Sequence, residues 1–149
     1  MSVSSQYVTI RKAYITDQKG IEDLVFSEWL NPFGLYWQRF WVVETRGNLI
    51  ACAQLRVYKN LEELSSLAVA PKYRGQGIGK HLAGYIVKQA YFSTYVLCVS
   101  QLIPFYRSVG FEQISSWFEL SDLLKLKFGL SSIAANLRQR SLIIMQYRK

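Results

Sequence analysis

The sequence predicts a single domain of mixed α/β (α+β) class, in which helices pack on a β-sheet. Strand-like and helix-like segments alternate along the chain with no linker, repeat or low-complexity stretch between them, and this alternation is typical of layered α/β domains. The chain has 149 residues, of which 50% are hydrophobic. A chain of that size can bury about 70% of the surface that it exposes when unfolded. We therefore expect residues 1–149 to form one domain.

The first segments predict a strand followed by a helix. Residues 7–11 form a short β-branched run, and either Thr16 or Asp17 can cap the helix that comes next. The helix has apolar residues at spacings of three and four, which is the pattern of one buried face. That face consists of Ile21, Leu24, Val25 and Trp29. Asn-Pro-Phe-Gly at residues 31–34 ends it.

Three further strands are expected before the middle of the chain. Residues 40–45 and 49–57 are β-rich runs on either side of the turn signal Gly47-Asn48, so they predict an antiparallel hairpin. Residues 61–69 (LEELSSLAV) form the third run, and Pro71 stops it.

The second half predicts two helices and three strands. The first helix has one apolar face, made of Ile78, Leu82, Tyr85 and Ile86. Residues 95–99 read as a buried strand and 102–108 as a short helix that ends at Gly110. Two closing strands are expected, one from residue 111 onward and one over 141–147. We assign no element to the basic stretch between them, FGLSSIAANLRQR.

A glycine-rich segment, YRGQGIGK at residues 73–80, precedes the first of these helices. It does not fit the phosphate loop of NTPases, because Arg74 replaces a glycine and His81 follows the lysine in place of serine or threonine. It does not fit the dinucleotide-binding motif, because Lys80 replaces the last glycine. Free amides at the helix N-terminus, flanked by Arg74 and Lys80, would suit a pyrophosphate. The alternative is a glycine turn with a purely structural role.

Two motifs around this segment resemble those of the GCN5-related N-acetyltransferases. Residues 74–79 (RGQGIG) match the family signature R/Q-x-x-G-x-G/A, and they follow a strand that ends LAVAP at 67–71. Residues 105–111 (FYRSVGF) look like the family's F-Y-x-x-x-G-F segment. Together with the strand and helix signals, the resemblance covers residues 7–147. The chain is therefore identified as a member of this family.

The resemblance implies a mixed sheet of six or seven strands with helices on both faces, in which two central parallel strands splay apart. Here these would be 61–69 and 95–99. Acetyl-CoA, the implied co-substrate, would enter the wedge, where preorganised backbone amides are suitable donors. The residues implied to bind it are Leu67, Ala68 and Val69 along the pantetheine and Arg74, Gly75, Gln76, Gly77, Ile78, Gly79 and Lys80 around the diphosphate.

The implied reaction is direct transfer of the acetyl group to an amine. An amine with a pKa near ~10.4 is neutral in only about one molecule in two thousand at pH 7, so a base helps. Glu63 matches the position of a glutamate that drains protons through water in some family members, and strand alternation would put it on one face with Ser65, Leu67 and Val69. A bulge would upset that alternation, and a solvated strand start is the alternative role for Glu63.

Tyr106 matches the family tyrosine whose hydroxyl protonates the departing CoA thiolate. The alternative is a core aromatic on a short helix. Cys98 lies on the strand beside the implied thioester path, and we favour a buried structural thiol there over an acyl-cysteine intermediate. His81, the only histidine, is expected at the surface or at the edge of the ligand.

The segment that leads into the short helix predicted over 102–108 bears on the acceptor. The segment 99–104 lacks the asparagine typical of family members that act on protein N-termini, and it is more similar to the small-molecule branch near N-acetylglutamate synthase. This favours a small-molecule amine, with Arg56 and Lys59 as candidates for a substrate carboxylate or, alternatively, as solvated cations. Part of an aromatic cluster is expected to line the acceptor pocket. It comprises Trp29, Phe33, Tyr36, Trp37, Phe40 and Trp41.

Charge and cysteine content leave few other classes of protein. The formal net charge of +8 fits a polyanionic ligand as well as nucleic acid, but no nucleic-acid-binding motif is legible. Of the two alternatives to an enzyme, a non-catalytic acyl-CoA sensor is favoured over a nucleic-acid-binding module. Cys52 and Cys98 lack metal-ligand spacing, so no metal is expected. The sequence has neither a membrane-span pattern nor a signal-peptide pattern, which predicts a cytoplasmic protein, and a homodimer is possible.

Overall fold

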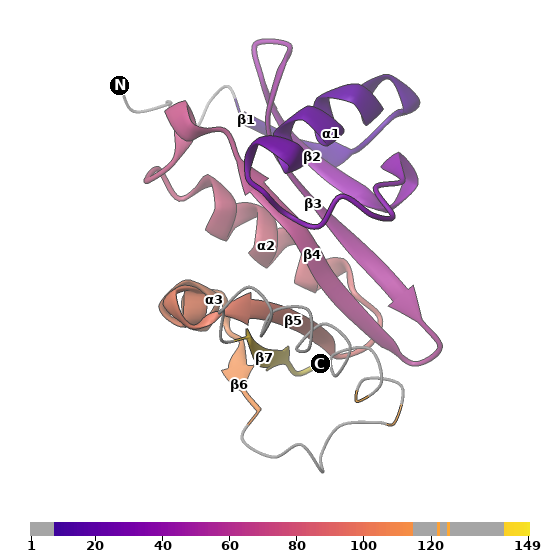
Figure 1. The fold of residues 1–149 in the computed structure, drawn as a ribbon, viewed down its shortest axis with the longest axis vertical. Helices are drawn as coiled ribbons and strands as arrows, with labels where there is room; N and C mark the ends of the chain where they lie inside the picture. The colour runs from indigo at the N-terminus through magenta and orange to yellow at the C-terminus, as the bar shows by residue number, and fades with distance from the viewer. Residues whose placement is uncertain (1–7, 115–121, 123–124, 126–141) are drawn as a thin grey trace.

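The protein forms one seven-stranded mixed sheet with the strand order β1-β2-β3-β4-β5-β7-β6. The computed structural model describes residues 8–114, 122, 125 and 142–149. The strands are β1 (Val8–Lys12), β2 (Phe40–Thr45), β3 (Asn48–Tyr58), β4 (Leu61–Val69), β5 (Thr94–Val99), β6 (Glu112–Gln113) and β7 (Leu142–Tyr147). The helices are α1 (Gln18–Ser27), α2 (Ile78–Gln89) and α3 (Ile103–Val109) (Figure 1). Strands β4 and β5 run parallel, and the other described pairs are antiparallel.

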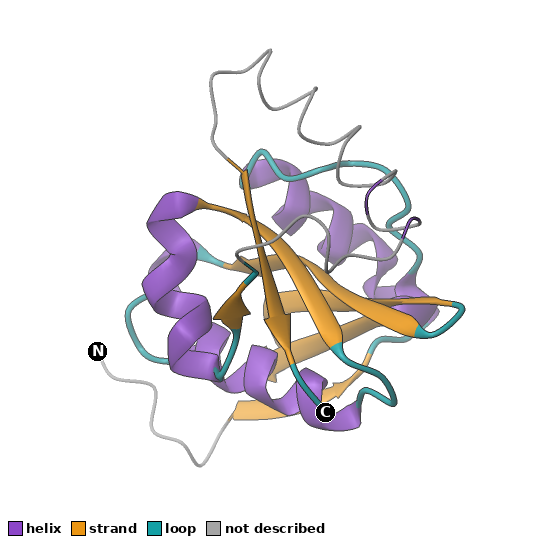
Figure 2. Ribbon diagram, turned by 90° about the horizontal axis from the view of Figure 1, so that it is seen from below, coloured by secondary structure: helices purple, strands orange, loops and turns teal. Residues whose placement is uncertain are grey.

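Helices cover both faces of the sheet, as expected (Figure 2). Each face has its own core, because alternate strand residues point to opposite sides. On one face α1 packs on β2, β3 and β4, with a core of Ala13, Ile21, Val25, Leu35, Phe40, Val42, Cys52 and Ala68. On the other face α2 and α3 cover the sheet, with a core that includes Val43, Ala51, Ala53, Leu64, Leu82, Ile86, Val96 and Tyr106. We call these the α1 face and the α2 face.

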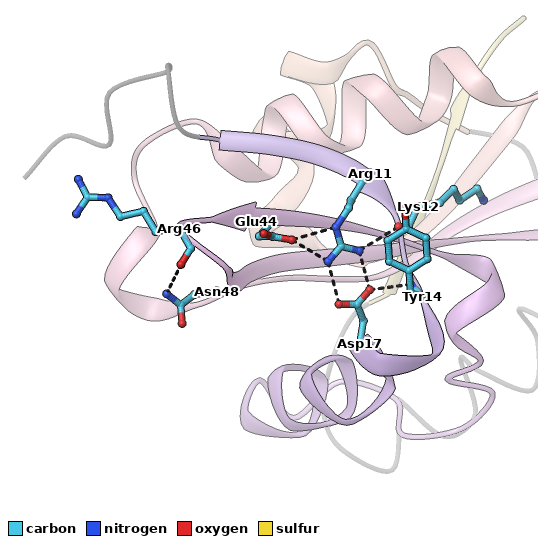
Figure 3. Close-up of polar contacts among 7 residues, drawn as sticks. All are labelled: Arg11, Lys12, Tyr14, Asp17, Glu44, Arg46 and Asn48. Atoms are coloured by element: carbon cyan, nitrogen blue, oxygen red, sulfur yellow. Dashed lines mark hydrogen bonds and ion pairs between the residues drawn. The ribbon is translucent and has the colours of Figure 1, made fainter.

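The first strand is tied to the start of α1 by one arginine (Figure 3). Arg11 donates to Asp17 with Nη1–Oδ2 at 2.7 Å and to Glu44 with Nη2–Oε2 at 2.8 Å. Asp17 also accepts the backbone N–H of Tyr14, with N–Oδ2 at 2.7 Å. Asp17 therefore caps the 3-10 turn that leads into α1, while Arg11 joins that turn to β2.

The hairpin between β2 and β3 forms one residue earlier than predicted. Arg46 and Gly47 have φ of 49° and 76°, and positive φ at both central residues is what a two-residue type I′ turn requires. Asn48 begins β3 instead of lying in the turn, and its Nδ2 donates to the Arg46 carbonyl at 3.2 Å (Figure 3).

The prediction that Trp29 belongs to the apolar face of the first helix was wrong. Helix α1 ends at Ser27, and Trp29 lies beyond it with φ of 55° and 86% of its surface exposed. The backbone N–H of Leu30 reaches the Val25 carbonyl at 3.3 Å as the chain leaves the helix. Leu30 packs against the α1-face core in place of the tryptophan.

Strands β4 and β5 pair over a short distance and then separate. Their parallel pairing covers Glu62 with Thr94 and Glu63 with Tyr95. Figure 1 shows the two strands diverging from there towards α3. The splayed central strands expected from the family resemblance are therefore present. None of the helices in the described residues is long and apolar enough to cross a membrane.

Some predicted elements lie outside the described residues. They are the first residue of the N-terminal run, Tyr7, the first residue of the closing run, Ser141, and the basic stretch over 128–140.

Candidate active site

The separation of β4 from β5 leaves a wedge-shaped opening in the middle of the sheet. Beyond Glu63, the pairs of β4 run to β3. Residues 64–69 therefore turn their other backbone edge towards the opening. Because that edge carries N–H and C=O groups at a regular spacing, an extended ligand can add to it as a strand would.

A bulge in β4 decides which side chains face each side of this opening. In the pairing with β3, Gln54 is opposite Ser65 and Cys52 is opposite Ala68, so β4 carries one extra residue. Ser66 takes up the extra length with φ of 53°. Cys52 and Gln54 hold it there. The Cys52 thiol reaches the Ser66 carbonyl at 3.9 Å, and the Gln54 amide donates to the Ser66 hydroxyl at 2.9 Å.

The bulge overturns the predicted shared face of β4. Leu67 and Val69 pack against the α2-face core. Glu63 and Ser65 point to the other side, because their cross-strand partners Arg56 and Gln54 alternate with α2-face residues of β3. Ala68 is buried in the α1-face core. Leu67, Ala68 and Val69 still line the opening through their backbone.

The glycine-rich loop lies at the end of β4 and leads into α2. Gly75 and Gly77 have φ of 71° and 80°, a conformation that favours glycine. The first intrahelical bond of α2 runs from His81 N–H to the Gly77 carbonyl at 2.9 Å. The amides of Ile78, Gly79 and Lys80 thus precede the helical ladder, and first-turn amides at the positive end of a helix dipole suit an anion.

Gly79 allows α2 to approach the strand and helix beside it. A Cβ on Gly79 would be 3.3 Å from Val69 Cγ2 and 3.6 Å from the Phe105 ring. This close packing brings the loop, the end of β4 and α3 to one corner of the opening. Gln76 and Lys80 are exposed at that corner.

Arg74 has partners that the sequence did not predict. Its Nε donates to the Val69 carbonyl at 3.0 Å, and its guanidinium forms an ion pair with Glu28 just beyond α1. Arg74 therefore connects the glycine-rich loop to the far end of α1. Glu28 gives no local signal of this role, because the contact spans 46 residues of sequence, from 28 to 74.

Tyr106 lies on the α2 side of the opening. Its side chain is buried, with Phe105 and Phe111 packed edge-on against the ring at centroid distances of 4.9 and 5.6 Å. Burial raises the pKa of the Tyr106 hydroxyl, and the nearby Cys98 raises it further. The phenol therefore stays protonated at neutral pH. Burial raises the pKa of the Cys98 thiol to about 11, so Cys98 is a thiol and not a reactive thiolate.

Glu63 lies on the α1 side of the sheet, at the apex of the opening. It is 6% exposed, and the Tyr58 hydroxyl donates to its Oε2 at 3.2 Å. It is the last β4 residue paired with β5. The prediction of a solvated strand start does not describe this site, since both Glu62 and Glu63 are buried. Glu62 has a structural partner, because its carboxylate accepts the Phe92 N–H at 2.9 Å.

The remaining sequence candidates separate into core and surface residues. His81 is exposed on α2, and Lys59 is exposed at the turn between β3 and β4. Of the aromatic cluster, Phe40 is fully buried in the α1-face core, and Trp41 packs on the α2 face against Tyr85. The exposed members are Trp29, Phe33 and Tyr36. The part of the chain that the structure describes holds no group of His, Cys, Asp and Glu suited to a metal ion.

These features lie together at the opening between β4 and β5. A backbone edge and a loop of free amides lie next to each other, with a protonated tyrosine on one side of the sheet and a carboxylate on the other. The family profile described as "Acetyltransferase (GNAT) domain" matches residues 36–113. The chain belongs to the GNAT acetyltransferase family.

Comparison with individual proteins places N-acetylglutamate synthase among the similar structures. An amino-acid acetyltransferase of Pseudomonas syringae pv. syringae is 32% identical over 126 residues, which are 74% of this chain and 29% of that protein. N-acetylglutamate synthase from Neisseria gonorrhoeae, in complex with coenzyme A and N-acetyl-glutamate, superposes with a TM-score of 0.77 and 21% identity over 98% of this chain and 36% of that one.

A Mycobacterium tuberculosis protein in complex with CoA superposes with a TM-score of 0.78 and 22% identity, over 95% of this chain and 99% of that one. The structural matches establish the fold. The match covers 29% of the length of each of the three curated relatives, which is less than a third.

Proposed function

We propose that this protein is an acetyl-CoA-dependent N-acetyltransferase that moves the acetyl group directly to the primary amine of a small molecule. The observation that carries the proposal is the opening between β4 and β5, which has the first-turn amides of α2 at one end and Tyr106 and Glu63 on opposite sides of the sheet. The curated relatives support a small-molecule acceptor, since they are named amino-acid acetyltransferases.

The residues proposed to bind acetyl-CoA fall into two groups. Leu67, Ala68 and Val69 present the backbone edge for the pantetheine, and the loop presents its amides and cations for the diphosphate. The loop residues are Arg74, Gly75, Gln76, Gly77, Ile78, Gly79 and Lys80. The Val69 carbonyl accepts from Arg74 Nε, and its second lone pair can accept from the ligand. The Arg74 guanidinium can turn from Glu28 to the diphosphate, to which it offers paired donors.

The proposed reaction uses the two sides of the opening separately. Acetyl-CoA supplies the thioester. The amine nitrogen attacks the thioester carbonyl from the α1 side, so that a C–N bond forms and the C–S bond breaks. Glu63 takes the proton of the amine, directly or through a water, and Tyr106 gives a proton to the thiolate on the α2 side. Because the pKa of Tyr106 is raised, the phenol is still protonated when the thiolate leaves.

Binding is tested by thermal shift with CoA and acetyl-CoA on wild type, Gly77→Glu and Gly47→Glu. Both glycines have left-handed φ, 80° and 76°, with no atom within 4 Å of a Cβ, so the two variants share the same backbone strain. Ligand at a hundred times its Kd adds about 2.7 kcal/mol of stability. We expect this gain in wild type and Gly47→Glu and its loss in Gly77→Glu. An equal response of both variants would contradict the loop as diphosphate site.

Catalysis is tested with Tyr106→Phe and Glu63→Gln in a free-thiol assay with a panel of small amines. Each change is expected to lower kcat about a hundredfold, within the range for general acid–base groups, with CoA affinity retained. Tyr91→Phe is the control, because Tyr91 is 86% exposed. If wild type binds CoA and no amine or amino acid is acetylated, the chain is an acyl-CoA sensor and the proposal is wrong.

A further inference from the structure

Three buried polar atoms on the α1 side of the opening have no hydrogen-bond partner within the described part of the chain. They are Gln54 Oε1, Arg56 Nε and Ser65 Oγ. Gln54 and Ser65 are directly opposite each other on β3 and β4, and Arg56 is two residues further along β3 on the same face. We call them the β3–β4 polar cluster.

Two of the three residues, Gln54 and Arg56, are held in place by hydrogen bonds from their other polar atoms. Gln54 is fully buried, and its amide nitrogen is fixed by the 2.9 Å bond to Ser66 in the bulge, so its carbonyl oxygen is the free end. Arg56 donates from Nη2 to the Phe33 carbonyl at 2.8 Å, and a Cβ on Gly34 would be 3.3 Å from that nitrogen. The loop after α1 thus packs against the Nη2 end of the guanidinium, and Nε is left without a partner among the described residues.

Charged residues near the cluster include Arg56, Glu63 and Arg39, whose Nη1 would lie 4.0 Å from the same Gly34 Cβ. Arg56 and Glu63 are cross-strand partners, so the proposed general base lies beside Arg56. Lys59, the other cation predicted for a carboxylate, is exposed at the turn and lies away from the cluster. The cluster therefore offers one cationic donor, one hydroxyl and one carbonyl acceptor on the same face of the sheet as the proposed base.

Burying such groups without a hydrogen bond is unfavourable, and a ligand with complementary groups recovers that cost. Arg56 Nε and the Ser65 hydroxyl are donors, which suits a carboxylate. Gln54 Oε1 is an acceptor, which suits an amine N–H. An amino acid carries a carboxylate and an amine on one carbon. The three unpartnered atoms of the cluster lie on the adjacent strands β3 and β4.

We propose that Gln54, Arg56 and Ser65 select an amino acid as the acceptor. Arg56 and Ser65 bind its carboxylate, and Gln54 directs its amine towards Glu63 and the opening. This inference rests on the proposed acetyltransferase function. It goes further by naming the three residues that read the substrate and by requiring a carboxylate beside the reacting amine.

The test measures acetylation of the twenty proteinogenic L-amino acids, each beside its decarboxylated amine. At least one amino acid is expected to exceed its decarboxylated amine at least tenfold in kcat/KM, because a site built to pair with a polar group rejects the analogue that lacks it. Arg56→Met should lower kcat/KM for that amino acid at least tenfold, mainly through KM. It should leave the decarboxylated amine within about twofold of its wild-type value. Ser65→Ala should act in the same direction.

Lys59→Met is the matched control and should leave kcat/KM unchanged for both the amino acid and its decarboxylated amine. Titration of the preferred amino acid into the CoA complex gives a second readout that does not need turnover, and Arg56→Met should weaken it about tenfold. Equal acetylation of both members of every pair, or equal loss of both in Arg56→Met, overturns the inference and leaves a structural cluster. Acetylation of neither while CoA binds overturns it as well. If wild type does not bind CoA, the result contradicts the proposed function itself.

Discussion

Asp17 shows how one ionised side chain holds the N-terminal strand to α1. Its carboxylate accepts from both Nη atoms of Arg11 at 2.7 and 3.0 Å, and from the Tyr14 N–H (Figure 3). Hydrogen bonding from Arg11 lowers the pKa of Asp17, and burial opposes this only in part. A carboxylate whose pKa is lower in the folded than in the unfolded state stabilises the fold above the unfolded pKa, near ~3.9, and loses this effect as the pH falls through the folded value.

Asp17→Asn is therefore expected to destabilise the protein in a pH-dependent way. At pH 7 it should cost about 1.5–3 kcal/mol, the range for hydrogen bonds to charged groups, and the difference from wild type should shrink as the pH falls from about 5 to 3. Urea unfolding across that range measures it. Asp23→Asn is the control, because its ion pair with Lys19 is exposed and worth little. A cost for Asp17→Asn that is the same at pH 3 and pH 7 would assign the effect to shape instead of charge.

The sequence predicted candidate site residues that belong to local motifs, and it did not predict the residues that contact them over long sequence distances. Tyr106 and the glycine-rich loop each belong to a short motif of adjacent residues, FYRSVGF and RGQGIG, that can be recognised in the sequence. Glu28 meets Arg74 only because α1 ends above the loop, and Gln54 meets Ser66 only because β4 bulges there. Neither contact has a spacing that could be read from one sequence, because both depend on how distant elements pack.

At the scale of elements, α2 contains a glycine that no contact requires. Gly84 lies in the middle of the helix, and a Cβ there would meet nothing within 4 Å. Alanine in a helix interior is more stable than glycine by about 0.5–1 kcal/mol. Gly84→Ala should therefore raise Tm by roughly 1–4 °C, with CoA binding unchanged.

Gly79→Ala in the same helix is the matched comparison. Its Cβ would crowd Val69 at 3.3 Å and Phe105 at 3.6 Å, so the gain in propensity should be cancelled and the corner beside the loop disturbed. Thermal unfolding with and without CoA compares the two variants. Equal stabilisation by both would mean that the packing of α2 on β4 and α3 is looser than these distances indicate.

Strand bounds were predictable where turn signals flank an apolar run. Residues 40–45 and 61–69 have the bounds expected from their sequence. The bulge at Ser66 was not predictable, since it sits at a non-glycine residue and depends on the register with β3. That one feature moved Leu67 and Val69 to the opposite face from Glu63, which separates the proposed cofactor strand from the proposed base.

At the scale of the whole molecule, the sheet consists of two parts with a weak junction. Strands β1 to β4 form an antiparallel unit, and β5 to β7 form another. The two are joined in the sheet by the parallel pairs of Glu62 with Thr94 and Glu63 with Tyr95. Side-chain packing under α2 supplements this junction on one face, because the α2-face core contains residues from both parts, including Leu64 and Val96.

A ligand in the opening should strengthen this junction more than any other part of the fold. CoA bound as proposed pairs with the backbone of β4 beyond Glu63, so amides there that now exchange by local opening lose that route. Hydrogen exchange with and without CoA is expected to slow most over residues 64–69 and 74–80, and least in β1. Gly77→Glu with CoA should show no such pattern. Uniform slowing of exchange across β1 and β4 would mean that CoA stabilises the whole fold without binding in the opening. The β4–β5 junction would then not be the site of the proposed reaction.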